Sequence, residues 1–237
     1  MSVAPNKNPF FKAVRLCGMF SFLAVVVLIC ACHSRTAVME PDETLQKDAI
    51  ILVLPFQNLN RIFGDDTGYR CPVSGKVYEI GEVAEGAVEF LNDQLVSALT
   101  KHEGLVVIPP GQAEGEISAL LSKKKTDVSE LELLIKTGER FGAEAVLLNR
   151  VYRFVRRTGK PYAVESPASV GLDMLLVRTT DSRILWNGYV DETQQPLSEN
   201  LFRIGSFIRR RGKWLTAEEI ATEGIVDALE TFPGVMP

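Results

Sequence analysis

Cysteine and histidine, the residues that most often build metal and nucleophile sites, are scarce in this chain of 237 residues. Of its four cysteines and two histidines, only Cys71 and His102 lie beyond residue 35. A zinc site takes several nitrogen or sulfur ligands, so the sequence predicts no metal centre. Cys71 and His102 could form a nucleophile and a base. However, His102 ends an apolar helical pattern, where the helix dipole favours a cation, and we therefore expect no catalytic pair.

A phosphate-binding loop is also missing. Gly68 and the pair Gly75-Lys76 lie between a strand pattern and a helix pattern, where such a loop would stand. The loop needs the sequence G-x-x-x-x-G-K-[ST]. Here six residues separate the two glycines, and Val77 follows the lysine. We expect no nucleotide and no other cofactor. An enzyme that uses carboxylates stays as a weaker alternative, although no two acidic residues have a recognisable spacing.

The chain lacks an excess of positive charge and a long apolar run. Its 26 Lys and Arg against 30 Asp and Glu give a net charge of −4, which argues against binding of nucleic acid. The uncharged stretch 16–31 has 16 residues, short of the roughly 20 that a membrane-spanning helix needs. Lys7, Lys12 and Arg15 precede it, and no acidic residue occurs before Glu40. This combination is typical of an export signal.

The end of the apolar stretch, Ile29-Cys30-Ala31-Cys32, resembles a bacterial lipobox, in which a small residue precedes the lipidated cysteine. Ala31 meets this requirement for Cys32, whereas bulky Ile29 precedes Cys30. We predict a signal peptide over 1–31 and acylation of Cys32 with palmitate-like chains, since more than one chain gives stable attachment. An uncleaved signal anchor and a cytosolic core strand are the alternatives. His33 stands where an aspartate would favour the inner membrane, so we expect a periplasm-facing lipoprotein of the outer membrane.

Processing at Cys32 would leave Cys71 as the single thiol in an oxidising compartment. An unpaired cysteine there indicates burial, an intermolecular disulfide or a reactive thiol. Pro72 and Gly75 favour turns around Cys71. One interpretation is a cysteine packed under its own loop, and the other is an interchain disulfide or a contact with a partner. Loss of the three basic residues of the signal would change the net charge from −4 to −7.

Apolar periodicity predicts one folded domain over 49–233, joined to the membrane by a polar tether over 32–48. The run 49–59 predicts a strand buried on both faces, and a long loop insertion at 60–81 follows it. A loop over 159–167 and a hairpin over 168–193 are expected later. The other predicted elements are a helix over 83–104, a strand over 105–110, helices over 115–124 and 127–142, a strand over 143–157, and closing helices over 199–212 and 215–233.

The predicted order is therefore β-α-β-α-α-β-β-β-α-α. An opening β-α-β unit followed by a meander indicates an α/β protein with a mixed sheet. We expect the helices to cover the sheet as an α/β sandwich.

These elements resemble those of a group of bacterial envelope lipoproteins. The string "ILVLPFQNL" is similar to the opening strand of the curli-secretion (CsgG-like) lipoproteins, of the lipoprotein activators of penicillin-binding proteins, and of the TolB N-terminal domain. The strings "LVSALTKHEGLVVI", "GERFGAEAVLLNRVYRF" and "LLVRTTDSRILWNGYV" resemble later parts of the same families. The resemblance covers roughly residues 49–190. It implies an α/β sandwich like the anticodon-binding domain and action by protein–protein contact rather than by catalysis.

The sequence thus predicts an accessory or assembly factor that contacts another envelope protein and is attached to the membrane through lipid on Cys32. A homo-oligomeric subunit of a curli-type secretion complex is the alternative. Arg209, Arg210 and Lys213 gather positive charge in an acidic chain. They form either a solvated helix end or a contact for an anionic partner, such as lipid headgroups, lipopolysaccharide or an acidic protein.

Overall fold

A computed structural model describes residues 44–64, 68–112, 115, 129–160, 163–194 and 214–234, all within one compact unit, Val38–Pro237. Cys32, the chain up to residue 43 and the cationic residues Arg209, Arg210 and Lys213 lie outside the described residues. The predicted helices over 115–124 and 199–212 lie outside them as well, apart from Gly115. Predictions on these segments therefore stay predictions.

A mixed sheet with the strand order β10-β9-β6-β1-β5 forms the centre of the unit. β1 runs parallel to β5 and β6, while β9 runs antiparallel to β6 and β10. The short β2 pairs with β6 beside this path. The mixed α/β class predicted from the sequence is confirmed. The strands are β1 (Ala49–Val53), β2 (Gln57–Asn58), β5 (Leu105–Ile108), β6 (Ala145–Val155), β9 (Ser169–Arg178) and β10 (Ile184–Thr193).

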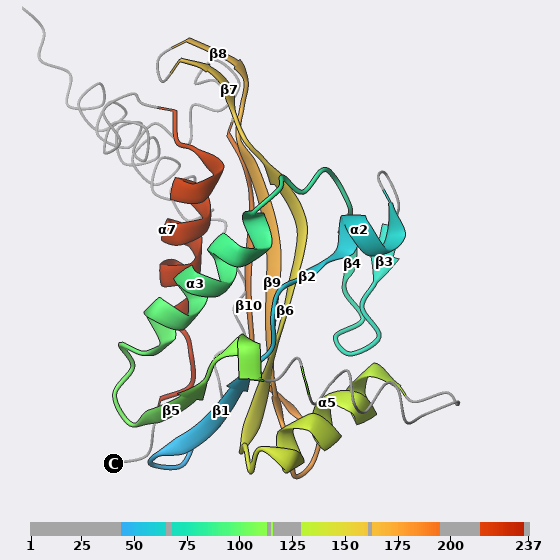
Figure 1. The fold of residues 1–237 in the computed structure, drawn as a ribbon, viewed down its shortest axis with the longest axis vertical. Coiled ribbons are helices and arrows are strands. Elements are labelled where there is room, and N and C mark those ends of the chain that lie inside the picture. The colour runs from blue at the N-terminus through green and yellow to red at the C-terminus, as the bar shows by residue number, and fades with distance from the viewer. Residues whose placement is uncertain are drawn as a thin grey trace, which may run out of the picture. The chain divides into compact units, whose positions relative to one another are not determined.

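Two helices, α3 (Ala87–Leu99) and α7 (Ala217–Leu229), lie side by side on one face of the sheet (Figure 1). α3 buries a residue at every fourth position, as an amphipathic helix does. α7 begins with a capping box, in which Thr216 and Glu219 each bond the other's backbone N–H. None of the helices in the described ranges combines the length and the apolar character of a membrane span. The buried residues of α3 are Ala87, Leu91, Leu95 and Leu99.

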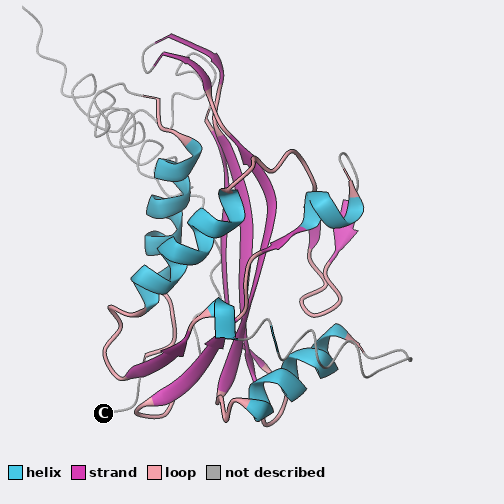
Figure 2. Cartoon of the chain, viewed as in Figure 1, coloured by secondary structure: helices cyan, strands magenta, loops and turns pink. Residues whose placement is uncertain are grey.

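The other face carries α5 (Glu130–Arg140) and the insertion (Figure 2). The prediction of a plain loop at 60–81 was wrong. The segment holds a short helix, α2 (Leu59–Phe63), and a hairpin of β3 (Gly68–Arg70) and β4 (Val77–Glu79). Such short elements are too brief for a periodic sequence pattern. The insertion is therefore an ordered part of the domain in its described residues.

The folded unit begins before the predicted boundary at residue 49. Leu45 is fully buried among the residues under α3 and α7, and its N–H donates to the carbonyl of Gly234 over 3.0 Å. The N–H of Gln46 donates to the carboxylate of Glu144 over 3.3 Å. Hence the predicted tether ends by residue 44, and the chain enters the unit at the end where β1 begins.

A second hairpin extends from the opposite end of the sheet, where a loop over 159–167 was predicted. β7 (Thr158–Lys160) pairs with β8 (Ala163–Ser166), and the two continue beyond the end of β6 and the start of β9 (Figure 1). The prediction was wrong because the strands are short and lack apolar alternation. The sheet thus has the chain's entry at one end and a projecting hairpin at the other.

Candidate interaction site

Arg150 and Asp173 are buried charges on the face that the insertion covers. Both residues are 0% exposed, and they lie opposite each other in the β6–β9 register. Removing a charged group from water costs several kcal/mol unless partners compensate it. The partners of these two residues therefore show how the insertion and α5 attach to the sheet.

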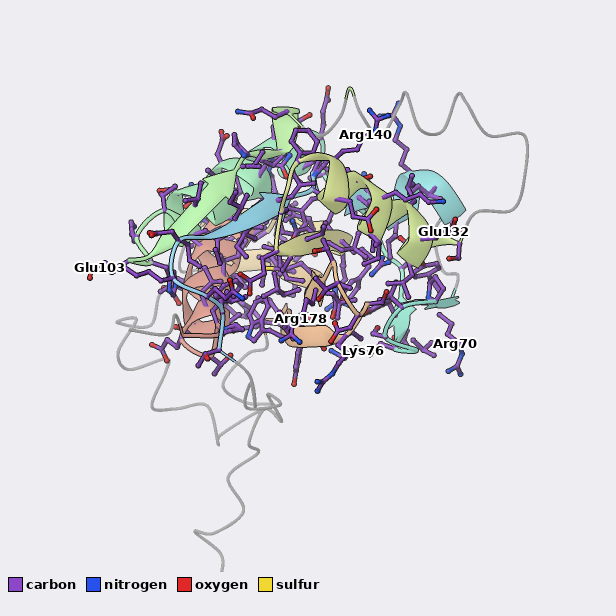
Figure 3. All side chains as sticks on the ribbon, turned by 90° about the horizontal axis from the view of Figure 1, so that it is seen from below. Arg70, Lys76, Glu103, Glu132, Arg140 and Arg178 are labelled. Carbon is purple, nitrogen blue, oxygen red and sulfur yellow. The ribbon has the colours of Figure 1, made fainter. Side chains whose placement is uncertain are left out.

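Asp173 binds the turn of the β3–β4 hairpin through Lys76. Its Oδ1 accepts from Lys76 Nζ over 3.3 Å and from Asn187 Nδ2 over 2.9 Å. The ammonium of Lys76 also lies 4.2 Å from the centroid of the Tyr189 ring, within range of a cation–π contact. One lysine thus joins the hairpin to both β9 and β10. Figure 3 shows Lys76 and Arg70 on the hairpin side of the sheet, with Arg70 pointing outward.

Arg150 binds the start of α5. Its Nη2 donates to Glu130 Oε1 over 2.8 Å, and its guanidinium lies 5.9 Å from the Tyr69 ring centroid. Burial lowers the pKa of Arg150, but Glu130 with Cys71 and Tyr69 raises this pKa by more. The guanidinium therefore stays charged. Its position between Glu130 and Tyr69 joins α5 and β3 to the middle of β6.

Four aromatic rings connect the outer helix of the insertion to the sheet. Phe63 stacks on Tyr69 with centroids 4.6 Å apart, Tyr69 on Tyr78 at 6.3 Å, and Tyr78 packs against Tyr152 at 4.9 Å. Burial, followed by nearby carboxylates, raises the pKa of Tyr78 and of Tyr152, so both phenols stay neutral. Such ring pairs contribute about 0.5–1.5 kcal/mol each beyond their buried area.

Cys71 lies in the turn of the hairpin and is fully buried. Its N–H donates to the carbonyl of Lys76, and its Sγ accepts from the N–H of Ser74 over 3.3 Å. This geometry favours the packed cysteine, while an interchain disulfide would require the hairpin to open and stays a prediction. His102 packs against Phe232, which belongs to the cluster under α3 and α7. The sheet therefore separates Cys71 from His102.

The outer surface of the insertion exposes three large apolar side chains, which we call the insertion patch. Ile62 is 58% exposed, Phe63 47% and Val77 60%. Val77 points outward because its neighbour Tyr78 points into the core, as the alternation of a strand requires. Exposed Arg61 and Arg70 belong to the same segment. Exposed apolar side chains mark a protein–protein contact where they form one surface, so the insertion patch is the candidate contact in the described residues.

The sequence did not reveal Arg150, Asp173 or the insertion patch. Arg150 and Asp173 are charged residues within largely apolar strand runs, and this is the signal that could have paired them. Ile62 and Phe63 stood out only as apolar residues within a polar insertion. In the described ranges, no three His, Cys, Asp or Glu side chains gather closely enough to hold a metal ion.

No protein-family model matches the sequence. No curated protein matches it either. Solved structures do match, among them the PelC dodecamer from Paraburkholderia phytofirmans, with 13% identity, a TM-score of 0.41, and coverage of 81% of this chain and 94% of that chain.

Two further similar structures have TM-scores of 0.37 and 16% identity. The C-terminal domain of LpoB from Escherichia coli is matched over its whole length and over 68% of this chain. A lipoprotein from Neisseria meningitidis is matched over 97% of its length and over 69% of this chain. The similar structures thus include a lipoprotein, and at such TM-scores they assign no function. The resemblance to curli-secretion lipoproteins and to TolB stays a prediction.

Proposed function

We propose that the protein is an accessory or assembly factor of the bacterial envelope, anchored through acylated Cys32 and acting by contact with another envelope protein. The observation that carries the proposal is the insertion patch. Its three apolar side chains face solvent, whereas the neighbouring residues Leu59, Cys71 and Tyr78 are buried against the sheet. Removing apolar surface from water is favourable by about 25 cal/mol per Å² before the entropic costs of association, so a partner would gain by covering the patch.

The attachment of the insertion supports this function. A two-stranded hairpin is at best marginally stable alone. Here Lys76 holds the turn against Asp173, and Tyr78 and Cys71 are buried beneath it. A surface that is already ordered loses less conformational entropy on binding. The buried charges therefore keep the patch ready for a partner.

The lipobox supports the anchored location. About 12 residues separate Cys32 from Leu45, where the folded unit begins, and such a segment spans at most about 40 Å. The domain would then act close to the membrane that holds it. The outer membrane, with the domain in the periplasm, is part of the proposal.

Acylation tests the anchor. Cells that produce the full chain are labelled with a palmitate analogue and separated into membrane and soluble fractions. The wild-type chain and the control Cys30→Ser should carry the label and stay in the membrane fraction. Cys32→Ser should lose the label. A label that persists on Cys32→Ser would show that the anchor is assigned wrongly.

Co-purification tests the contact. The acylated chain is extracted with mild detergent, and the proteins that elute with it are compared among variants. Ile62→Ser with Val77→Ser should lower the recovered partner by about tenfold, the effect of losing roughly 1.4 kcal/mol of binding energy. The control Val226→Ser, on α7, should leave recovery unchanged. A chain that elutes alone at every stage would contradict the proposal.

A homo-oligomer is the second candidate, because β5 and β10 each have an unpaired edge within the described residues. A second copy of the chain could pair with such an edge. Size-exclusion chromatography in detergent separates the candidates, since a subunit of a curli-type secretion complex should elute as one large species without other proteins. Arg209, Arg210 and Lys213 stay candidates for an anionic partner, and their joint neutralisation would have to weaken binding.

A further inference from the structure

The β7–β8 hairpin carries an unusual concentration of positive charge. Between residues 153 and 165 the chain has Arg153, Arg156, Arg157 and Lys160 against one acid, Glu165, whereas the whole chain has a net charge of −4. The hairpin is also the part of the described unit that projects past the ends of α3 and α7 (Figure 1). The positive charges of such an element are expected to pair either with carboxylates of the same chain or with a partner.

The two arginines at the base of the hairpin are compensated within the chain. Arg153 pairs with Asp191 on β10, and its Nε donates to Ser169 Oγ over 2.6 Å. Arg156 donates from Nε to Glu218 Oε1 over 2.7 Å, at the first turn of α7. Burial raises the pKa of Glu218, but the hydrogen bond from Arg156 helps to lower this pKa below its ordinary value. These bonds fix the base of the hairpin against β10 and α7.

The two cations nearer the tip have no such compensation. Among the described residues, no carboxylate pairs with Arg157 or Lys160. Lys160 is exposed, while Arg157 is half-buried and donates from Nη1 to the carbonyl of Gly159 over 2.9 Å. Gly159 has a φ of 91°, a left-handed conformation that glycine adopts readily. Arg157 and Lys160 therefore place two positive charges in and just before β7, with no carboxylate partner among the described residues.

The hairpin points away from the anchored end of the domain. The chain enters at Leu45, beside Gly234 and the start of β1. β6 starts at that end and has 11 residues, which span about 35 Å, and the hairpin lies beyond its far end. The hairpin is thus the part of the described unit remote from Leu45, where the described chain enters.

We infer that the β7–β8 hairpin is a docking element for an acidic surface of another envelope protein, with Arg157 and Lys160 as its contact residues. The inference rests on the proposed function, because that function supplies another envelope protein as the partner. Charge complementarity of this kind speeds association and selects the partner. It adds a recognition site of a different chemistry to the apolar insertion patch. Anionic lipid is the competing target, and the test separates the two.

The test uses the full, acylated chain in cells, with the photo-crosslinking residue p-benzoylphenylalanine in place of exposed Thr158. We expect an adduct with a protein. Its yield should fall about tenfold when Arg157→Gln and Lys160→Gln are combined, because the neutral tip loses the attraction. The matched control, Lys47→Gln with Lys101→Gln, neutralises two exposed lysines near the anchored end and should leave the yield unchanged. Circular dichroism checks that both double variants stay folded.

Three results would overturn the inference. They are an adduct yield that does not depend on Arg157 and Lys160, adducts with lipid alone, and loss of binding to phosphatidylglycerol vesicles as the sole effect of the double variant. A parallel crosslinker at Val77 reports on the insertion patch. Protein adducts from Val77 with none from Thr158 would refute the hairpin inference and leave the proposed function standing. No protein adduct from either position would refute both.

Discussion

The two faces of the sheet are covered in different ways. Under α3 and α7 lies a large cluster of buried apolar side chains, in which Trp186 fills the space and donates its indole N–H to Thr231 over 3.1 Å. Under the insertion and α5, buried Arg150 and Asp173 bind Glu130 and Lys76. Apolar packing is non-directional and stabilises a helix in proportion to the apolar area that it buries. A buried ion pair adds little net stability to the fold. Removing one of the two partners nevertheless destabilises the fold strongly when the other charge stays buried and unpaired.

The difference indicates that packing under α3 and α7 stabilises the fold, whereas the contacts on the other face hold the insertion and α5 in place. Replacing buried ion pairs by apolar residues is often neutral or stabilising. We interpret Lys76–Asp173 and Arg150–Glu130 as contacts that fix the position of the insertion and of α5, and so the direction of the insertion patch.

The largest effect is expected on the apolar face. Leu95→Ala removes a fully buried side chain from α3 and should lower the free energy of unfolding by about 2–5 kcal/mol in urea titrations. The exposed control Val226→Ala should change it by less than about 0.5 kcal/mol. A small loss for Leu95→Ala would mean that α3 does not carry the core.

Breaking the contact between Lys76 and Asp173 should lower the stability by less, and the effect should be confined to the insertion. Asp173→Ala removes the buried carboxylate that binds Lys76 and Asn187, and because the Lys76 side chain is 38% exposed and stays solvated, the loss should be about 2 kcal/mol. Limited proteolysis should then cut within 59–81, because the turn is no longer held. The double variant Lys76→Met with Asp173→Leu should recover most of the stability. Equal protection of 59–81 in Asp173→Ala and wild type would refute the role assigned to this contact.

Close helix–sheet packing should be common to both faces. A Cβ at Gly138 on α5 would overlap Thr179 and Val146, and one at Gly224 on α7 would overlap Val190. Alanine normally favours a helix by about 1 kcal/mol over glycine. Here we expect Gly138→Ala and Gly224→Ala each to lower the melting temperature, with a loss of about 1–2 kcal/mol. A rise in melting temperature for either variant would show that the sheet relaxes to accept the methyl group.

The smallest effect should come from the ion pair at the base of the β7–β8 hairpin. The pKa of Glu218 lies below its ordinary value of 4.5, so the pair stabilises the fold above that pH. The contribution should disappear as the pH falls through the lowered pKa. Because solvent screens the pair, Glu218→Gln should cost only about 0.5 kcal/mol at pH 7. In urea titrations the difference between wild type and variant should be largest at pH 7 and should shrink as the pH falls below 4.5.

The long elements could be predicted because each repeats a pattern. The four-residue spacing of Leu91, Leu95 and Leu99 predicted α3, and the run before Pro55 predicted β1. The hairpin β9–β10 followed from two strand patterns around a short turn. The hairpin predicted over 168–193 agrees closely with β9 and β10, whereas the predicted strand over 49–59 ends six residues after β1 and the predicted helix over 83–104 exceeds α3 by four or five residues at each end.

The contacts that attach the insertion and α5 to the sheet could not be predicted from the sequence. β3 and β4 have three residues each, too few for a periodic signal. Arg150 meets Asp173 only through the register of two strands, which a single sequence does not specify. Leu45 follows polar residues, and its burial depends on the distant Gly234. These features arise from tertiary contacts between segments far apart in the chain.

The comparison of two valines tests the central claim most directly. Val77 on the insertion is 60% exposed, and Val226 on α7 is 48% exposed, so the two differ in face rather than in chemistry. A photo-crosslinking residue is placed at either position in the full, acylated chain in cells. The proposed function predicts protein adducts from Val77 and few or none from Val226. Equal yields from the two positions, or adducts from Val226 alone, would contradict it.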